Sequence, residues 1–317
     1  MKKAFSLIEV IFVLVILGIV ASLSSQIIVQ VYDNYITQRA VYNVSTKTEL
    51  VANQIVNRLS YRIQGTTISK VHQDFLDGTA TPTSWLPLKD IPTGNSYTSI
   101  EWIGYDNDSF AADKTPNWSG IANYETASRN SFTTPGSNLP NVRTIMDNLS
   151  SGEVDLINEP AAVIFSQDDN FYTETEVYDP SCMGLIPEVE TNTSCIFPVI
   201  SNGIDGFTFT RSQDPNNATI LPKIITERYK LAWSAYSLAP ERNAETGQFD
   251  LFLYSNYQPW NGESYMDVGV TKNIILPNVT VFKFSENGGV INFKLCASED
   301  IGQDFNVTTC KQKVVIR

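Results

Sequence analysis

The chain has 317 residues, a formal net charge of -12 and 42% hydrophobic residues. That is enough apolar material for a core and enough length for one large domain or two ordinary ones, so a disordered chain is excluded. The acidic balance argues against a nucleic-acid-binding protein, which needs clustered Lys and Arg, and the single histidine, His72, nearly excludes a His-rich metal site.

The N-terminal stretch is strongly apolar. From Phe5 to Leu23 only Ser6, Glu9 and Ser22 are polar, and two lysines stand just before the run. Nineteen helical residues span about 29 Å, close to the hydrocarbon thickness of a bilayer. The lysines should stay in the cytoplasm, which places the rest of the chain on the far side of the membrane.

Two ordinary interpretations of this stretch do not explain why a carboxylate, Glu9, lies within the apolar segment. One is a secretory signal peptide cleaved around residues 21–25, and the other is a plain transmembrane anchor. A carboxylate inside an apolar helix costs about 2.5–3.5 kcal/mol on insertion scales, so it usually has a partner.

The string Lys-Ala-Phe-Ser-Leu-Ile-Glu-Val at residues 3–10 resembles the processing site of type IV prepilins and type II secretion pseudopilins. The resemblance implies that residues 1–4 are a leader peptide, and that a prepilin peptidase cuts between Ala4 and Phe5 and methylates the new amine. Ala4 stands where the family usually has glycine. The resemblance also implies that Glu9 meets the N-terminal amine, on Phe5, of a neighbouring subunit, which would offset the desolvation of both charges.

A single long helix is expected over about residues 5–64. No proline precedes residue 82, and only one glycine precedes Gly65, which is a plausible C-terminal stop. The resemblance makes residues 5–30 the transmembrane and filament-core half. In the second half, 31–64, apolar residues recur at three- and four-residue steps (Ala52, Ile55, Leu59 and Ile63), which predicts a face that carries a globular domain.

The remaining chain changes character near residue 160. Residues 65–160 are rich in Pro, Gly, Ser, Thr and Asn and are interpreted as a loop-rich variable insertion, with a strand over 97–105 and a short helix near 142–149. A short apolar run predicts a strand at 161–166, and alternation predicts strands at 204–211, 229–235 and 249–253. A hairpin is expected over 279–295 that turns at Asn287-Gly288, with a last strand at 307–316. Residues 161–317 should therefore form an antiparallel β domain packed on the helix, an α+β, pilin-like fold.

The late strand from Leu276 to Phe284 and the large size resemble the big minor subunits, namely J-type pseudopilins and W-type minor pilins. This resemblance implies a structural protein that assembles with other major and minor subunits of a type IV pilus or type II secretion pseudopilus. Because Glu9 is present, the chain does not match the capping K-type subunit, which lacks the glutamate.

All four cysteines lie beyond the apolar run, where disulfides form. Three pairings are possible. Short loops favour Cys182 with Cys195 and Cys296 with Cys310. A zinc site is disfavoured because the chain has no Cys-x-x-Cys and one histidine.

Acidic clusters occur at 106–108, 168–169 and 174–176, but none has the spacing of an EF-hand loop. Solvated acidic loops are the favoured interpretation, with a loop-bound Ca²⁺ as the alternative. Asn192 and Asn306 fit an extended acidic sequon that some bacteria glycosylate, at a frequency near chance for this composition.

No Walker loop and no Gly-x-Ser-x-Gly motif is present, so no enzyme and no cofactor are expected. An alternative function is a tip adhesin or DNA-uptake pilin whose contact surface is the aromatic insertion from Trp85 to Trp118. A third hypothesis, a periplasmic enzyme held by a signal anchor, requires a cleft with perturbed carboxylates.

Overall fold

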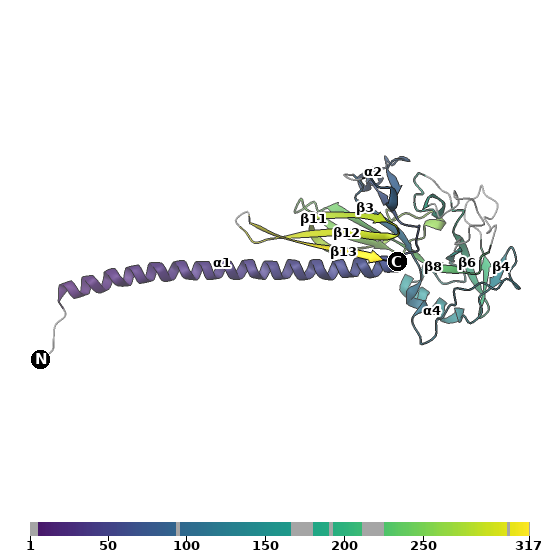
Figure 1. Cartoon of the computed structure of the whole chain (residues 1–317), viewed down its shortest axis with the longest axis horizontal. Coiled ribbons are helices and arrows are strands. Elements are labelled where there is room, and N and C mark those ends of the chain that lie inside the picture. The colour runs from purple at the N-terminus through teal and green to yellow at the C-terminus, as the bar shows by residue number, and fades with distance from the viewer. Residues whose placement is uncertain are drawn as a thin grey trace.

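The computed structural model describes residues 6–92, 96–165, 180–189, 193–210, 225–302 and 305–316. A single helix, α1 (Leu7–Ser60), runs from the N-terminus into a globular part that lies at its far end (Figure 1). At about 1.5 Å per residue its 54 residues make a rod of about 81 Å. The α+β fold class predicted from the sequence is confirmed.

Helix α1 ends earlier than its sequence predicts. The cap residue is Tyr61, and Gly65, with its φ of 80°, lies in the turn that follows. The helix ends here because the following backbone bonds to the main sheet instead: the Ile63 N–H donates to Ile103 O at 2.8 Å. The Arg62 guanidinium donates to Leu59 O at 2.9 Å, which satisfies one of the carbonyls that the helix end leaves free.

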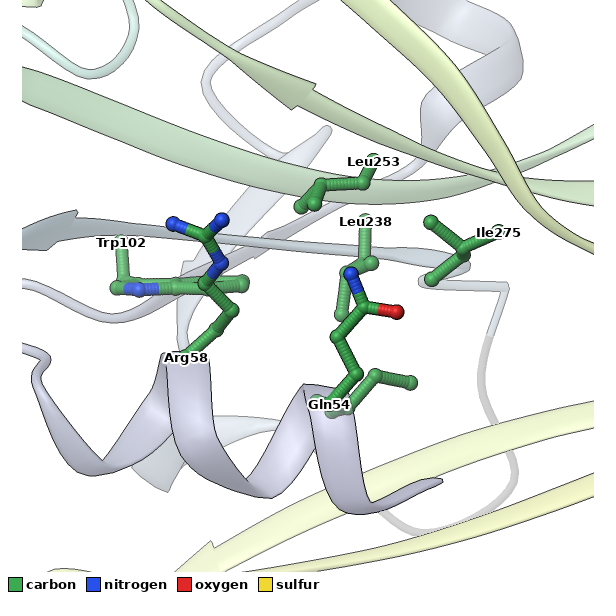
Figure 2. Close-up of a pocket in the computed structure, with 7 residues that line it drawn as sticks. Gln54, Arg58, Trp102, Leu238, Leu253 and Ile275 are labelled. Carbon is green, nitrogen blue, oxygen red and sulfur yellow. The ribbon is translucent and has the colours of Figure 1, made fainter. Parts of the chain in front are cut away.

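Eight antiparallel strands form the main sheet, in the order β13-β12-β11-β10-β9-β3-β1-β2. They are β1 (Ile68–Lys70), β2 (Trp85–Pro87), β3 (Ser99–Gly104), β9 (Ser234–Arg242), β10 (Phe249–Ser255), β11 (Thr271–Asn287), β12 (Val290–Asp300) and β13 (Asn306–Ile316). The second half of α1 packs on one face of this sheet through its apolar side chains Val44, Val51, Ala52, Ile55 and Leu59. Figure 2 shows the contact close up, with Gln54 and Arg58 of the helix beside Trp102, Leu238, Leu253 and Ile275 of four strands.

A second antiparallel sheet lies beyond the C-terminal end of α1 (Figure 1). Its order is β4-β7-β6-β5-β8, formed by β4 (Ser131–Thr133), β5 (Ala161–Phe165), β6 (Phe197–Asn202), β7 (Gly206–Phe209) and β8 (Tyr229–Ala232). Helix α4 (Leu139–Ser150) contributes to the same core, which is built around aromatic rings such as Trp118, Phe132, Phe207 and Tyr229. The remaining helical turns are α2 (His72–Leu76), α3 (Asn107–Phe110), η1 (Leu88–Asp90), η2 (Pro180–Met183) and η3 (Pro259–Asn261).

The predicted division of the chain at residue 160 does not separate the two sheets. Strands β1, β2 and β3 come from the part interpreted as an insertion, yet they complete the main sheet through the β3–β9 pairing. Conversely, β5 to β8 follow residue 160 but belong to the second sheet, together with β4. The chain then crosses back, because β8 is followed after Trp233 by β9 of the main sheet.

The predicted hairpin at Asn287-Gly288 is present as β11–β12. Asn287 pairs with Val290, so the two turn residues are Gly288 and Gly289, both with positive φ (59° and 78°). Two positive φ values in a two-residue loop suit the twist of the strands, and glycine adopts them without a steric penalty. Arg62 Nη2 donates to Gly289 O at 2.6 Å, so this turn is anchored to the end of α1.

Candidate functional site

The helix begins with a reciprocal cap between Ser6 and Glu9. The Glu9 N–H donates to Ser6 Oγ at 3.4 Å, and the Ser6 N–H donates to Glu9 Oε2 at 3.1 Å. These bonds satisfy donors that the first turn leaves free, at the end of the helix where negative charge is stabilised. The carboxylate is therefore held at the very start of the helix. Ala4 and Phe5 lie outside the described residues.

The first half of α1 has no contact with the rest of the chain that buries a side chain. Among the described residues of α1, the first buried one is Ala40. The helix is long and apolar enough to cross a membrane, and none of its most apolar window is buried in the globular part. The core helix of a soluble protein would be mostly buried, so this apolar surface must be covered by something other than its own domain.

A charged contact fixes the helix to the C-terminal strand. Glu49 lies between Lys313, whose Nζ is 2.5 Å from Glu49 Oε1, and Lys311, whose Nζ is 3.4 Å from Oε2. The Lys313 hydrogen bond is the main cause that holds the pKa of Glu49 below its usual range. Since β13 is the outermost strand of the main sheet, this contact joins the sheet edge directly to α1.

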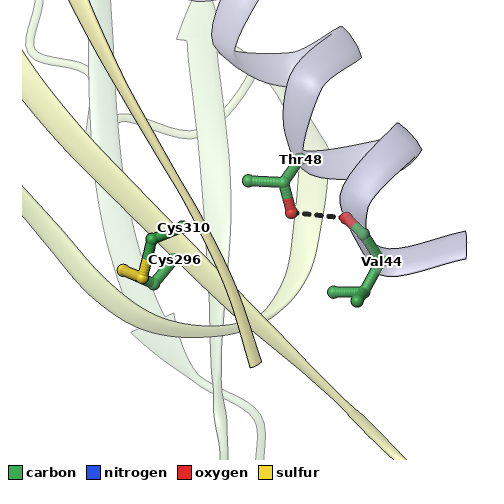
Figure 3. Close-up of a disulfide and its surroundings, with 4 residues drawn as sticks. All are labelled: Val44, Thr48, Cys296 and Cys310. Atoms are coloured by element: carbon green, nitrogen blue, oxygen red, sulfur yellow. Dashed lines mark hydrogen bonds between the residues drawn. A yellow bond between two sulfur atoms is a disulfide. The ribbon is translucent and has the colours of Figure 1, made fainter. Parts of the chain in front are cut away.

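Two disulfides are present, Cys182–Cys195 and Cys296–Cys310, the pairs that short loops favoured. Cys296 and Cys310 are directly opposite each other on β12 and β13. Figure 3 shows this disulfide with the helix turn that carries Val44 and Thr48, where Thr48 Oγ1 donates to Val44 O at 2.6 Å. The Cys296–Cys310 disulfide therefore links β13, whose lysines contact Glu49 of α1, to the interior strand β12.

A buried ion pair joins β1 to β3. Lys70 Nζ lies 2.7 Å from Glu101 Oε2, and the two side chains are 0% and 1% exposed. Lys70 also donates to Leu185 O at 2.7 Å, and the Tyr257 hydroxyl donates to Glu101 Oε1 at 2.9 Å. Burial raises the pKa of Glu101, and Lys70 opposes that rise. The pair is sealed from solvent, so no substrate reaches it, and its role is to fasten the segment around Leu185 to the main sheet.

His72 lies beside this pair and is also buried. Its Nδ1 is 2.9 Å from the Tyr265 hydroxyl, and its Nε2 is 3.8 Å from Glu241 Oε1. Burial, helped by the positive charges of Lys272 and Lys70, lowers the pKa of His72 to about 4. The histidine is therefore neutral at pH 7, and among the described residues its ring nitrogens contact Tyr265 and Glu241 rather than a serine or cysteine nucleophile.

The acidic cluster at 106–108 is used for capping. Asp106 accepts from the Ser109 N–H at 3.1 Å and from the Ser109 hydroxyl, as the N-cap of α3. Burial raises the pKa of Asp106 to about 7. Within the described residues no group of three or more His, Cys, Asp or Glu is arranged to hold a metal ion. The clusters at 168–169 and 174–176 lie outside the described residues, as does Asn192. Asn306 is exposed at the start of β13.

A groove of about 590 Å³ separates the end of α1 from α4. Its lining combines polar side chains with tyrosine rings, and the Arg58 guanidinium lies 5.3 Å from the centre of the Tyr236 ring. Asp108 is the only carboxylate among its lining residues, so the perturbed carboxylates that a periplasmic enzyme would need do not meet here.

The tryptophans proposed as an adhesive surface are mostly core residues. Trp102 is 0% exposed and packs under α1, while Trp118 is 2% exposed and its indole N–H donates to Asp106 O at 3.1 Å. Trp85 is half-buried in β2. Aromatic residues in this segment therefore fill two cores, and the contact surface expected from Trp85 to Trp118 is not formed by these rings.

Comparison with protein families gives one match: residues 1–25 fit the model of the prokaryotic N-terminal methylation motif. No curated protein matches the chain, and no solved structure matches it. The motif marks the type IV pilin and pseudopilin family, whose members are structural and generally non-enzymatic. The motif therefore supports a type IV pilin-like or pseudopilin precursor, and the long apolar N-terminal helix of this chain fits it.

Proposed function

We propose that the protein is a minor subunit of a type IV pilus or type II secretion pseudopilus. The methylation motif implies processing by a prepilin peptidase and assembly with other pilin subunits. The observation that carries the proposal is that α1 combines this motif with 33 described residues, 7–39, none of which is buried by the globular part. The large, two-sheet globular part supports a minor subunit, because a bulky head is costly in a subunit repeated along a shaft.

In this proposal the precursor is anchored in the inner membrane with its globular part in the periplasm. Cleavage between Ala4 and Phe5 frees the amine of Phe5, which is then methylated. During assembly the Glu9 carboxylate leaves its cap with the Ser6 N–H and meets the amine of a neighbouring subunit. Pairing of opposite charges in a dry interior offsets the desolvation of each.

Mass spectrometry of the mature N-terminus from native membranes tests the processing step. The expected species begins at methylated Phe5. A chain that begins near residue 25 would instead mean a secreted protein without its helix, and an intact Met1 would mean a plain anchor.

The docking step is tested by matched charge removal on the same helix. Glu9→Gln should leave cleavage intact and reduce incorporation into filaments, measured by immunoblot of sheared filaments against total protein. Asp33→Asn is the control, since it removes one carboxylate from the exposed part of α1 outside the motif. Equal incorporation of the two variants would contradict the role of Glu9.

A further inference from the structure

The groove between the end of α1 and α4 has the size and the position of a ligand site. Its volume of about 590 Å³ lies within the range of about 300–1,000 Å³ that is typical of small-molecule sites. One wall comes from α1 and the main sheet, and the other comes from α3 and α4, which pack with the second core. Ligand sites occur preferentially at such junctions between two packed units.

The tyrosine rings that line the groove are held in place by the protein's own packing. Tyr236 of β9 and Trp102 of β3 are cross-strand partners, and their rings stack with centroids 5.8 Å apart. Gly104 makes room for the tyrosine, since a side-chain carbon there would lie 2.6 Å from Tyr236 Cε2. At the end of α1, the ring of Tyr61 stands edge-on to that of Tyr105 at 5.6 Å. A ligand that packs on these rings therefore loses little binding energy to ordering them.

Hydrogen-bonding side chains surround the rings. Gln54, Asn57 and Arg58 are exposed at three- and four-residue steps on one face of α1, and Gln54 and Arg58 extend to the same side of the helix (Figure 2). Asn107 and Asp108 of α3 line the same groove. Together they supply planar amide, guanidinium and carboxylate groups, each with two hydrogen-bonding positions side by side. Such groups are suited to adjacent hydroxyl groups of one ligand.

Two other ligand classes do not suit this lining. Nucleic acid requires clustered cations, whereas the charged residues among those described around the groove are Arg58 and Asp108, one of each sign. One common mode of peptide recognition adds the peptide backbone to a free strand edge. Here the Tyr105 N–H already donates to Tyr61 O at 2.9 Å, and Gly104 is paired with β9 inside the main sheet. The groove therefore presents side chains to a ligand and not a free backbone edge.

We propose that this groove binds a short, uncharged saccharide. A sugar ring has an apolar C–H face, which packs on a tyrosine ring, and a rim of hydroxyl groups, which bond to amide, guanidinium and carboxylate groups. Ile145 and Leu149 of α4 add apolar contact area on their side of the groove. The binding is a property of the globular part and requires neither cleavage, methylation nor filament assembly.

Saturation-transfer difference NMR of the full-length chain tests the proposal. The probes are a panel of neutral disaccharides that contain glucose, galactose, mannose or N-acetylglucosamine. The chain is kept in a detergent without a sugar headgroup, so that the detergent does not compete. At least one probe should receive saturation from the protein. Asn57→Ala should weaken its binding roughly fivefold through the loss of one hydrogen bond, and Tyr61→Leu by a similar factor through the loss of a ring face.

Each variant has a matched control outside the groove. Asn53→Ala removes the same side chain one turn earlier on α1, and Tyr124→Leu removes a tyrosine that is 60% exposed. All four residues are exposed, so the substitutions leave both cores intact.

Binding that weakens only in the Asn57 and Tyr61 variants supports the groove as the site. No binding by any member of the panel, or equal binding by each variant and its control, overturns the proposal. The mass of the mature N-terminus decides the proposed function separately, so a failure of saccharide binding is distinguishable from a failure of processing.

Discussion

The buried Lys70–Glu101 pair makes a strong prediction about how the globular part is held together. Removing one partner leaves the other in a site that is 0–1% exposed. Glu101→Leu leaves the Lys70 ammonium with Leu185 O as its hydrogen-bond acceptor and with the rings of Phe75 and Tyr265 at 4.6 and 5.0 Å. Breaking a buried pair in this way typically costs about 3–5 kcal/mol of unfolding free energy.

The reverse substitution, Lys70→Met, should cost about the same, because it leaves the Glu101 carboxylate buried with the Tyr257 hydroxyl as its donor. The double variant Lys70→Met/Glu101→Leu removes both charges. It should lose less stability than the sum of the two single losses, by roughly 1–3 kcal/mol, since neither charge is then left alone. Its residual cost is the unpaired Leu185 carbonyl and the Tyr257 hydroxyl, about 1–3 kcal/mol each.

Urea unfolding of the full-length chain in detergent measures these free energies through tryptophan fluorescence, with Trp102 buried in the main core as a reporter. The control is the partly exposed pair formed by Lys272 and Glu241, with Nζ and Oε2 2.7 Å apart and side chains that are 41% and 19% exposed; Lys272→Met should cost less than either single variant of the buried pair. Additive losses to within about 0.5 kcal/mol in the Lys70–Glu101 cycle would refute the reasoning.

Three further predictions concern single groups. Burial lowers the pKa of His72 to about 4, while an unperturbed histidine titrates near 6.5, so the folded chain binds fewer protons and the free energy of unfolding falls by about 3 kcal/mol as the pH falls from 6.5 to 4. The urea midpoints of the parent and His72→Gln should converge over that range, and a constant difference would contradict the prediction. The pH dependence from Asp106 has the opposite sign, because burial raises its pKa to about 7 in the folded chain, above the usual 3.8. The free energy of unfolding therefore falls as the pH rises between these values, and the stability of Asp106→Asn should increase relative to that of the parent between pH 4.5 and pH 8. Parallel pH profiles of the two chains would refute this. Cys296→Ala/Cys310→Ala removes a disulfide of sequence separation 14 and should lower the free energy of unfolding by about 3 kcal/mol, measured by thermal unfolding. Cys182→Ala/Cys195→Ala, which removes a disulfide of separation 13, is the comparison. An unchanged melting temperature would show that strand pairing alone holds β13 on the sheet.

Local signals in the sequence predicted the helix and the hairpin well. Both depend on residues that are close in the chain: the absence of proline before residue 82 for α1, and Asn287-Gly288 for the β11–β12 hairpin, although the turn itself lies one residue later, at Gly288 and Gly289. Glu9 was identified for the same reason, because an isolated carboxylate in an apolar run is costly wherever the chain folds. The role of Ser6 as the capping partner of Glu9 was missed, although Ser-x-x-Glu at residues 6–9 is the capping-box pattern.

The sheet order and the buried pair could not be predicted in this way. Lys70 and Glu101 belong to short strands, and nothing in their spacing distinguishes them from solvated residues. Glu49 and Lys313 are 264 residues apart, and their contact follows from β13 being the last strand beside α1. Likewise, the crossing of the chain between the two sheets follows from which apolar faces bury each other, and alternation along one strand does not specify its neighbour.

The contacts between α1 and the sheet suggest how a head of this size is held on a rod. The strand beside the helix is β13, which as an edge strand would be the easiest to peel away. Here that strand is attached three times: by an eleven-residue register with β12, by the Cys296–Cys310 disulfide, and by the two lysines on Glu49. If α1 is extracted from the membrane as in the proposed assembly, a force on it would be transmitted from Glu49 to β13 and, through the disulfide, to the interior strand β12. The half of α1 that bears these contacts begins at Ala40, so the exposed half below it is left free for other subunits.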